Sequence, residues 1–464
     1  MLRYCVGQSR GRQSLVGVLA LILTIGGGAV ANAQLDSGLI SQAEAQSIGL
    51  VRSWFARAQV NPARSRAVHW VLSGEQLFVV TNAGTFHALD AGTGQTLWIT
   101  HVGNPDYPSF GPGTNDQLVA LVNGSTLYLL DRGNGHLVSQ RPVGGAPGAG
   151  PSLSQEYVFV PLVTGRIEGY PLDDESNRRA WFYQSYGRAL VRPLATPQNV
   201  AWVTDAGYMY VASANNPRIR YRLETVSEFA ASPAYHAPLI YAVSLAGELF
   251  AVDEQTGRQR WRYLTGFPTA RAPAVVGDRL YVTSDEPMLH AIDANTGAGQ
   301  WEAPGIVQFA ATTKQHVYGI DNFGTLHVLD RTTGRRRHRI STGGAIHAMV
   351  NDQTDRLFLI SETGLVQCLH EIGAEQPTYY IQPPSAAEGE AAEPPLEGYR
   401  GEGEPPTEPR PAAARPSDAE GPFAPLPEVD AENPFGPPAG GEADESDEPA
   451  DESPFGVEDE NPFG

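Results

Sequence analysis

Short runs of alternating apolar and polar residues recur along the middle of the chain, separated by turns that contain glycine. In residues 77–89, "LFVVT" and "TFHAL" flank "NAG" and predict two strands joined by a hairpin. Comparable hairpins centre on Asn123-Gly124, Thr164-Gly165, Asp205-Ala206-Gly207, Ala246-Gly247, Asn322-Phe323-Gly324 and Thr363-Gly364. The pattern therefore predicts a chain built mainly from β-hairpins.

Each hairpin is followed by the motif A-x-D-x-x-T-G-x-x-x-W or a weaker form of it. The acidic position recurs every 37–42 residues, at Asp90, Asp131, Pro171, Ser213, Asp253, Asp293, Asp330 and His370. A repeat near 40 residues made of strands is typical of propellers. A third strand follows each motif turn and a small-residue strand precedes each hairpin. Eight units of four strands predict an all-β fold, an eight-bladed β-propeller over residues 62–383.

Proline supports this arrangement, because it recurs in the small-residue strand at Pro151, Pro193, Pro233 and Pro273. Proline lacks an amide donor and is tolerated only at the edge of a sheet. The innermost strand of a blade is such an edge, which favours a propeller over a stacked solenoid.

The repeated motif has a structural explanation. Its aspartate can accept hydrogen bonds from amides of its own turn, and its glycine can adopt a left-handed backbone. Its tryptophan can bury about 150–250 Å² between neighbouring blades, where a small alanine leaves room. We therefore expect the motif to join blades.

Residues 34–61 are predicted to form an N-terminal helical segment. "SQAE" from Ser41 offers a capping box, and apolar residues recur at helical spacing at Ile48, Val51, Trp54, Phe55 and Ala58. We expect this helix to cover a patch of the propeller, and the alternative is that it binds a partner. The ring should be closed by residues 378–383 ("TYYIQP") or by residues 67–71 ("AVHWV").

Residues 1–33 have the features of a secretory signal peptide. Three arginines precede an apolar run from Leu15 to Ile25, and Ala31-Asn32-Ala33 offers a cleavage site. An uncleaved membrane anchor is the alternative, although the run is shorter than the ~20 residues of a spanning helix. Cys5 precedes the run, so no lipid anchor is expected. After cleavage Cys368 would be the only cysteine, which excludes an internal disulfide.

The formal net charge of -20 is concentrated at the end of the chain. Residues 384–464 contain 22 acids and three arginines, whereas residues 34–383 contain 30 acids and 26 bases. The propeller is therefore nearly neutral, and nucleic acid is not an expected partner. The tail of residues 384–464 is rich in Glu, Pro, Gly and Ala, so we expect it to be disordered.

The motif resembles the tryptophan-docking pattern of the pyrroloquinoline-quinone-type propeller family. Three repeats match in full, at Ala88, Asp90, Thr93, Gly94, Trp98, Ala251, Asp253, Thr256, Gly257, Trp261, Ala291, Asp293, Thr296, Gly297 and Trp301. A fourth, from Val328 to His338, matches in part. The resemblance covers residues 62–383 and implies a propeller that serves either as a quinone-dependent dehydrogenase or as a non-enzymatic protein.

Differences from the dehydrogenases favour the non-enzymatic branch. Those enzymes are longer, have adjacent cysteines beside the quinone and bind calcium beside a catalytic aspartate. This chain has no adjacent cysteines and no long insertion between its blades. It is more similar to the propeller subunit of the bacterial outer-membrane barrel-assembly machinery, an eight-bladed scaffold that is lipidated, unlike the form expected here.

No catalytic, cofactor-binding or metal site is predicted. His87, His290 and His327 occupy one equivalent position just before the small residue of the motif. Equivalent residues of different blades are separated by rotation about the propeller axis, so these side chains cannot share one ion. We interpret them as packing residues. The sequence also lacks a phosphate-binding loop, a zinc-binding helix and a nucleophile elbow.

Three connections between blades are aromatic and basic, and they share one face of the propeller with the hairpins. Aromatic and arginine side chains dominate the energetics of interfaces. We therefore expect an interaction surface here, with packing between blades as the alternative. Its candidate residues are Tyr107, Phe110, Tyr183, Tyr186, Arg188, Arg192, Phe267 and Arg271.

Two further segments are unusual. "RTTGRRRHR" places Arg335, Arg336, Arg337 and Arg339 on the expected outermost strand of the seventh blade. Such charge protects an edge strand, and the alternative is that it binds the acidic tail. The tail repeats NPFG or SPFG at Asn433, Pro434, Phe435, Pro454, Phe455, Asn461, Pro462 and Phe463. These turns could present phenylalanine to a receptor, or they could reflect low-complexity drift.

Taken together, the sequence predicts an exported, non-enzymatic and monomeric propeller that scaffolds proteins of the cell envelope, with outer-membrane protein assembly as one such role. We expect it in the periplasm, at the outer membrane or outside the cell, without a cofactor. The alternative is a quinone-dependent oxidoreductase or a small-ligand binder that uses the central channel.

Overall fold

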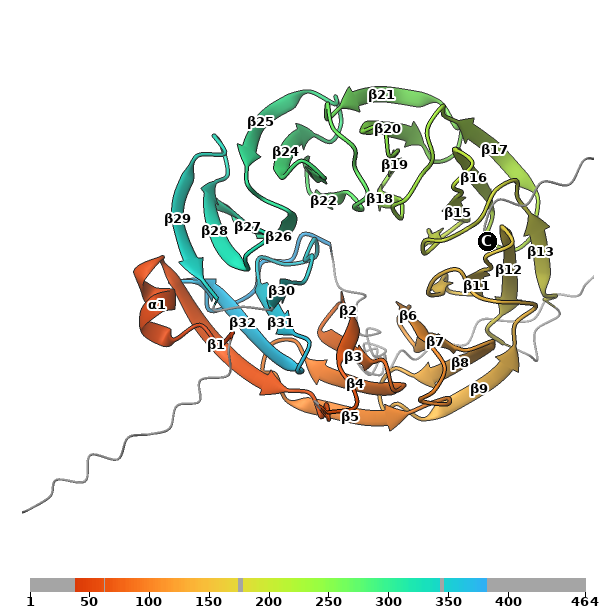
Figure 1. The fold of residues 1–464 in the computed structure, drawn as a ribbon. Coiled ribbons are helices and arrows are strands. Elements are labelled where there is room, and N and C mark those ends of the chain that lie inside the picture. Colours follow the sequence, from red (N-terminus) through yellow and green to blue (C-terminus); the bar gives the residue numbers. More distant parts are fainter. Residues whose placement is uncertain (1–37, 62, 174–177, 343–345, 382–464) are drawn as a thin grey trace, which may run out of the picture. The chain divides into compact units, whose positions relative to one another are not determined.

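A computed structural model describes residues 38–61, 63–173, 178–342 and 346–381. They form eight four-stranded antiparallel sheets arranged in a ring (Figure 1). The predicted eight-bladed β-propeller is therefore confirmed. The proposed signal peptide and the acidic tail with its NPFG and SPFG motifs lie outside the described residues.

The strands occupy four depths in the ring. The innermost strands are β2 (Ala67–Ser73), β6 (Ser109–Thr114), β10 (Ser152–Leu153), β14 (Leu194–Ala195), β18 (Ala234–His236), β22 (Ala274–Val276), β26 (Gln308–Thr312) and β30 (Ile346–Ala348). The second strands are β3 (Gln76–Thr81), β7 (Leu118–Asn123), β11 (Tyr157–Pro161), β15 (Asn199–Val203), β19 (Leu239–Val243), β23 (Arg279–Ser284), β27 (His316–Ile320) and β31 (Leu357–Ser361).

Two further strands complete each blade. The third strands are β4 (Thr85–Asp90), β8 (Thr126–Asp131), β12 (Arg166–Pro171), β16 (Tyr208–Ser213), β20 (Glu248–Asp253), β24 (Met288–Asp293), β28 (Thr325–Asp330) and β32 (Leu365–Glu371). The outermost strands are β5 (Thr96–His101), β9 (Leu137–Pro142), β13 (Trp181–Gln184), β17 (Ile219–Glu224), β21 (Gln259–Leu264), β25 (Gly299–Pro304), β29 (Arg336–Ser341) and β1 (Leu50–Arg57). We number the blades from β2–β5 as blade 1 to β30–β32 with β1 as blade 8.

The sequence repeat marks the third strand of every blade. Its acidic position is the last residue of that strand in blades 1 to 7 and the penultimate residue, His370, in blade 8. The four recurrent prolines directly precede the innermost strands β10, β14, β18 and β22. The hydrophobic core lies between the sheets, as where Tyr241 and Trp261 of blade 5 pack with Leu280 of blade 6.

The predicted N-terminal helical segment over residues 34–61 is wrong for most of its length. Only α1 (Gln42–Ser47) is helical, and the capping box is present, since Glu44 N donates to Ser41 Oγ at 3.2 Å and Ser41 N to Glu44 Oε2 at 3.0 Å. Gly49, at φ 82°, follows the helix, and the chain continues as β1. The free edge of β32 offers this segment backbone hydrogen bonds that a second helix would leave unmade.

The ring is closed by β1, which pairs with β32 as the outermost strand of blade 8. Both closing segments expected from the sequence are therefore wrong. Residues 67–71 lie in β2, the innermost strand of blade 1. Of residues 378–383, the described ones contribute a single bridge, between Tyr379 and Thr354. Figure 1 shows β1 on the outer rim beside β32.

The last described residues, beyond β32, pack on blades 7 and 8 and form no strand. Thr378 N donates to Asp355 Oδ1 at 3.1 Å, and Tyr380 OH donates to Thr312 O at 2.8 Å. No helix in the described part of the chain is long and apolar enough to cross a membrane.

Candidate interaction surface

The motif turn is held by its own aspartate. In blade 6, Asp293 Oδ1 accepts hydrogen bonds from Thr296 N and Thr296 Oγ1, both at 2.8 Å, and from Asn295 N at 3.1 Å. These bonds fix the direction in which the outermost strand leaves the turn, and they hold the pKa of Asp293 below its usual range.

Each motif tryptophan contacts the turn of the next blade. Trp261 Nε1 of blade 5 donates to Ala294 O of blade 6 at 3.0 Å, and Trp301 Nε1 of blade 6 to Arg331 O of blade 7 at 2.9 Å. The motif glycine lies beneath this ring: a Cβ on Gly297, at φ 73°, would come within 2.6 Å of the Trp261 indole. Glycine is therefore required both for the turn and for the approach of the neighbouring blade.

The same position is filled in blades without the full motif. Trp54 of β1 donates to Ala91 O at 3.1 Å, and Trp181 of β13 donates to Ala214 O at 3.3 Å. Tyr221 takes this place in blade 4, with its OH 3.3 Å from Asp253 O. Sequence reasoning missed the docking role of Trp54 because it assigned this residue to a helix.

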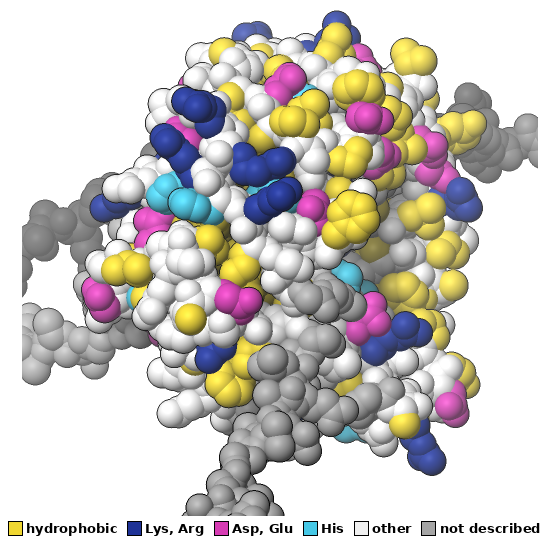
Figure 2. All heavy atoms as spheres, turned by 60° about the vertical axis from the view of Figure 1, so that its left-hand side comes forward, with side chains coloured by type: hydrophobic (Ala, Val, Ile, Leu, Met, Phe, Trp, Pro, Cys, Tyr) yellow, Lys and Arg dark blue, Asp and Glu magenta, His cyan; other side chains and the backbone are white. Residues whose placement is uncertain are grey.

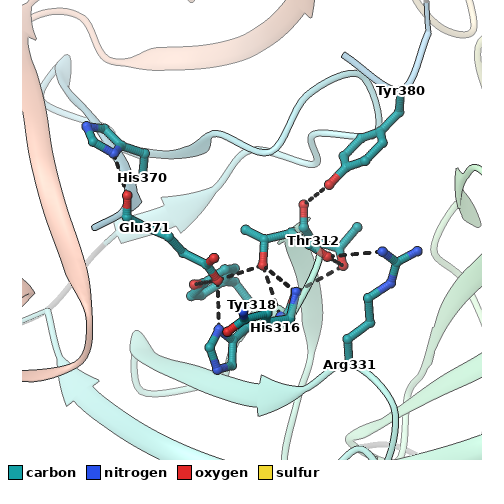
Figure 3. A network of polar contacts seen from close by, with 9 residues as sticks. Thr312, His316, Tyr318, Arg331, His370, Glu371 and Tyr380 are labelled. Atoms are coloured by element: carbon teal, nitrogen blue, oxygen red, sulfur yellow. Dashed lines mark hydrogen bonds and ion pairs between the residues drawn. The ribbon is translucent and has the colours of Figure 1, made fainter. Parts of the chain in front are cut away.

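Blade 7 has His338 where the indole would be, and a polar network joins it to blade 8 instead (Figure 3). Three side chains of blade 7 surround Glu371 Oε1 at the end of β32: Thr313 Oγ1 at 2.6 Å, His316 Nδ1 at 2.7 Å and Tyr318 OH at 3.0 Å. Burial, followed by the charge of Glu371, raises the pKa of Tyr318. The phenol therefore remains a hydrogen-bond donor over the physiological pH range.

His87, His290 and His327 lie apart in blades 1, 6 and 7, and all three are buried. His327 Nε2 lies 3.0 Å from Asp321 Oδ2, and His290 Nδ1 lies 3.3 Å from Glu302 Oε1. Burial lowers the pKa of each of these histidines. They occupy equivalent positions on separate sheets, and the structure brings none of them together.

A cleft of about 330 Å³ lies between blades 8 and 1, on the face that carries the motif turns. Its lining includes Asp90, Phe358, Cys368, His370 and Tyr379. Burial raises the pKa of the Cys368 thiol to about 12, so this thiol is protonated and unreactive at neutral pH.

The residues of this cleft do not provide the ligands that a calcium-dependent quinone site requires. In the described part of the chain, no group of three or more His, Cys, Asp or Glu side chains is arranged to hold a metal ion. Cys368 is the only cysteine among the described residues, so the adjacent pair of the dehydrogenases has no counterpart there.

Six of the eight candidate surface residues lie in three connections on the hairpin face, whereas Phe110 lies in β6 and Tyr183 in β13. Five of them are exposed: Tyr107, Tyr186, Arg188, Phe267 and Arg271. Phe110 and Tyr183 pack partly into the core, and Arg192 is half-buried. The connections precede blades 2, 4 and 6, so the structure does not unite all eight residues in one contact area.

Large exposed apolar side chains also occur along three consecutive connections, from blade 3 to blade 6. Large exposed apolar side chains lie in or beside each of them: Tyr186, Leu190, Val226, Leu264 and Phe267, which we call the blade 3–6 surface. Tyr186 is 71% exposed and Leu264 is 58% exposed. Sequence reasoning missed Leu190, Val226 and Leu264, because it selected aromatic and basic residues only.

The connection that carries Tyr186 is held by its neighbours. Arg188 N and Nε donate to the two carboxylate oxygens of Asp205, each at 2.6 Å, and Tyr186 N donates to Tyr210 OH at 3.2 Å. These bonds keep an exposed aromatic side chain on an ordered backbone, so binding there costs less conformational entropy.

Comparison with known proteins agrees with this fold. A family model described as outer membrane protein assembly factor BamB matches residues 56–165, 123–270 and 212–341. No curated protein matches the sequence significantly. The crystal structure of BamB from Moraxella catarrhalis is similar with a TM-score of 0.57 and 18% identity, covering 69% of this chain and 99% of that one.

A computationally designed protein, Ika8, is also similar, with a TM-score of 0.55 and 15% identity over 68% of this chain and 98% of its own. Identities this low show a shared fold only. The family-model matches together span residues 56–341, which is more than half of the chain. They confirm the resemblance to quinone-type repeat propellers. The chain belongs to the outer membrane protein assembly factor BamB family of β-propellers.

Proposed function

We propose that this protein is an exported, non-enzymatic scaffold of the cell envelope that takes part in outer-membrane protein assembly by binding other proteins through the blade 3–6 surface. Membership of the assembly-factor family supports the role. The proposed signal peptide of residues 1–33 supports export.

The observation that carries the proposal is the set of large apolar side chains exposed on three consecutive connections. Contiguous exposed apolar surface is unfavourable in water and marks binding sites when it lies on an ordered backbone. Tyr186 and Phe267 supply aromatic rings, which are enriched among the residues that dominate interface energies. Tyr107 and Arg271 extend the candidate surface around the same face, with Phe110, Tyr183 and Arg192 supporting it.

Site-specific photo-cross-linking in the native host tests this proposal. A photoreactive amino acid at Tyr186 or at Phe267 should link the protein to components of the outer-membrane assembly machinery, identified by mass spectrometry. Phe323 is the matched control, because it is 85% exposed in a hairpin of blade 7, outside the blade 3–6 surface. Equal cross-linking from all three positions would exclude a specific role for this surface.

A functional measurement complements the cross-linking. The Tyr186→Ala/Phe267→Ala variant should lower the amount of folded outer-membrane barrel proteins, whereas Phe323→Ala should leave it unchanged. If the double variant supports wild-type levels, the surface is not used in assembly.

The NPFG and SPFG motifs at Phe435, Phe455 and Phe463 are proposed as additional peptide ligands, and their deletion can be scored in the same assay.

A further inference from the structure

The turn before β29 and the strand itself carry more positive charge than the propeller neutralises. Between Asp330 and Ser341 there are five arginines and one aspartate, a net charge of +4. Figure 2 shows Lys and Arg side chains gathered, beside histidines, on the side of the propeller where β29 lies. Because β29 is an outermost strand, nothing in the sheet order covers its free edge.

Three of these arginines have partners in the propeller, and one of them, Arg331, also places its Nη2 atom 3.7 Å from Asp278 Oδ1. Arg331 Nη1 donates to Thr313 O at 3.2 Å, Arg336 Nη2 to Pro304 O at 2.7 Å, and Arg337 Nη2 to Asp330 Oδ2 at 2.7 Å. Among the described residues, the side chains of Arg335 and Arg339 make no hydrogen bond or ion pair, and both are exposed.

Another arginine-bearing outer strand differs from β29. On β21, Arg260 pairs with Asp253 at 2.7 Å and Arg262 with Glu248 at 3.1 Å. The β29 strand also lacks the docked tryptophan, because His338 stands in its place, and all four residues from Arg336 to Arg339 are exposed. The outer side of β29 and the turn before it are therefore basic, and the charges of Arg335 and Arg339 are paired with no carboxylate of the described residues.

We propose that this face binds the acidic segment of residues 442–460 of the same chain. The segment contains ten acids and no base. Guanidinium groups form charge-assisted hydrogen bonds with carboxylates, often in pairs, and keep their charge at all physiological pH values. No other stretch of this length in the sequence has a comparable excess of carboxylates.

The length of chain before the segment permits this binding. Ile381 is the last described residue, and the acidic segment begins at Glu442. The roughly 60 residues between them span about 90 Å as a helix and about 200 Å when extended, whereas a domain the size of the propeller is about 50 Å across. A covalently attached ligand also has a high effective concentration, so weak individual ion pairs suffice. The bound segment would shield β29 from other anionic partners.

Lys314 makes the binding measurable, because it is the only lysine of the chain. It lines a shallow depression together with Arg337 and His338. A carbodiimide joins a lysine amine to a carboxylate in direct contact with it. In the full-length protein at low salt, we expect a link between Lys314 and a carboxylate of residues 442–460, identified by mass spectrometry. The link should disappear in about 1 M NaCl, where the Debye length is ~3 Å.

Two double variants separate a specific contact from general attraction. Arg335→Gln/Arg339→Gln should lower the yield of this link about fivefold. Arg218→Gln/Arg220→Gln removes the same charge from β17 and the turn before it, another outer edge with exposed arginines, and should leave the yield unchanged. Circular dichroism checks that both variants keep the wild-type fold.

Several outcomes would overturn the proposal. These are the absence of the link at low salt, an equal loss in both double variants, or a link that mixing of ¹⁴N and ¹⁵N protein shows to form only between chains. Protection of Lys314 by anionic lipid vesicles, with no link to the tail, would assign β29 to a membrane surface instead.

Discussion

At the scale of single residues, the tryptophan contacts connect each sheet to the next. Trp301 is 9% exposed, and it bonds to Arg331 O across the boundary between blades 6 and 7. Trp301→Ala removes the indole and leaves a cavity above Gly334. We expect a loss of about 3–5 kcal/mol in the free energy of unfolding, measured by urea denaturation with circular dichroism.

Phe182→Ala is the control for this prediction, because the Phe182 side chain is 54% exposed. It should change the free energy of unfolding by much less. Trp301→Phe keeps most of the packing and loses the hydrogen bond. Its loss in the free energy of unfolding should therefore lie between those of Trp301→Ala and Phe182→Ala. Equal effects of Trp301→Ala and Phe182→Ala would show that the indole does not stabilise the ring.

A second prediction at this scale concerns pH. Hydrogen bonds from Arg260 and Thr256 lower the pKa of Asp253 to about 2, below its usual value. A lowered folded-state pKa contributes stability that is present above the unfolded pKa of ~3.9 and is lost as the pH falls through the folded value. Asp253→Asn should therefore be less stable than wild type at pH 6, and the difference should shrink between pH 4 and pH 2.

Urea denaturation at several pH values measures this difference. Asp106→Asn is a suitable control, since Asp106 lies in an exposed connection of the hairpin face. This substitution should change the free energy of unfolding little at pH 6, because the Asp106 side chain is exposed. A constant difference for Asp253→Asn over the whole pH range would mean that the carboxylate of Asp253 does not contribute through its charge.

What the sequence reveals at this scale depends on how local the contact is. The bonds of Asp293 to Thr296 lie within one turn, so the residue types suggest them directly. The glycine beneath each indole belongs to the next repeat, and its role becomes visible only when the blades are placed side by side. The sequence did not indicate that Glu371 would bind three side chains of blade 7. Thr313 and Tyr318 lie in the preceding blade, far from Glu371 in the sequence.

At the scale of elements, the eight-residue strand β1 connects two blades. It provides the outer strand of blade 8 and the indole that docks on blade 1. Deleting residues 38–57 should expose the edge of β32 and speed amide hydrogen exchange in β32 more than in β20 of blade 5. Hydrogen-exchange mass spectrometry measures both strands in the same sample.

Trp54→Ala is the milder variant for this test, because it keeps the strand and removes the docked ring. It should destabilise the protein while leaving the exchange of β32 slower than in the deletion. If the deletion leaves the protection of β32 unchanged, β1 is not needed to close the ring.

The strand β1 shows why some elements could not be assigned from sequence. A register shift between Arg52 and Trp54 interrupts the two-residue alternation of this strand. The apolar residues of this segment therefore also fit helical spacing; they are Val51, Trp54, Phe55 and Ala58. The partner strand β32 lies at the opposite end of the propeller sequence, so no local pattern could decide between the two. The four strands of each other blade follow one another in the sequence, so the motif spacing is sufficient to assign them to that blade.

At the scale of the whole molecule, the sequence predicts the fold, and it marks only some of the residues of the proposed interaction surface. The repeat determines the number of blades and the face on which the connections lie. Which connections present apolar side chains next to one another depends on the ring, and the blade 3–6 surface includes aliphatic residues that no motif marks.

The proposal that this protein is not a quinone-dependent enzyme can be tested on the intact protein. Pyrroloquinoline quinone with calcium should change neither the melting temperature nor the quinone absorbance, because the described residues offer no matching donor set. A quinone-dependent dehydrogenase from another source serves as the positive control. A saturable shift at stoichiometric quinone would instead favour the oxidoreductase alternative.

Closure by the N-terminal strand also has a consequence for biogenesis. Of the described strands, a ribosome makes β1 first and β32 last. At about 5–20 residues per second, the roughly 300 residues between them take roughly 15–60 s to synthesise. During that interval the nascent segment around Trp54 and Phe55 has no partner strand, and the ring of blades remains open. The ring can therefore close only after the last repeat has been made, and a chain truncated before β32 would leave β1 without its partner strand.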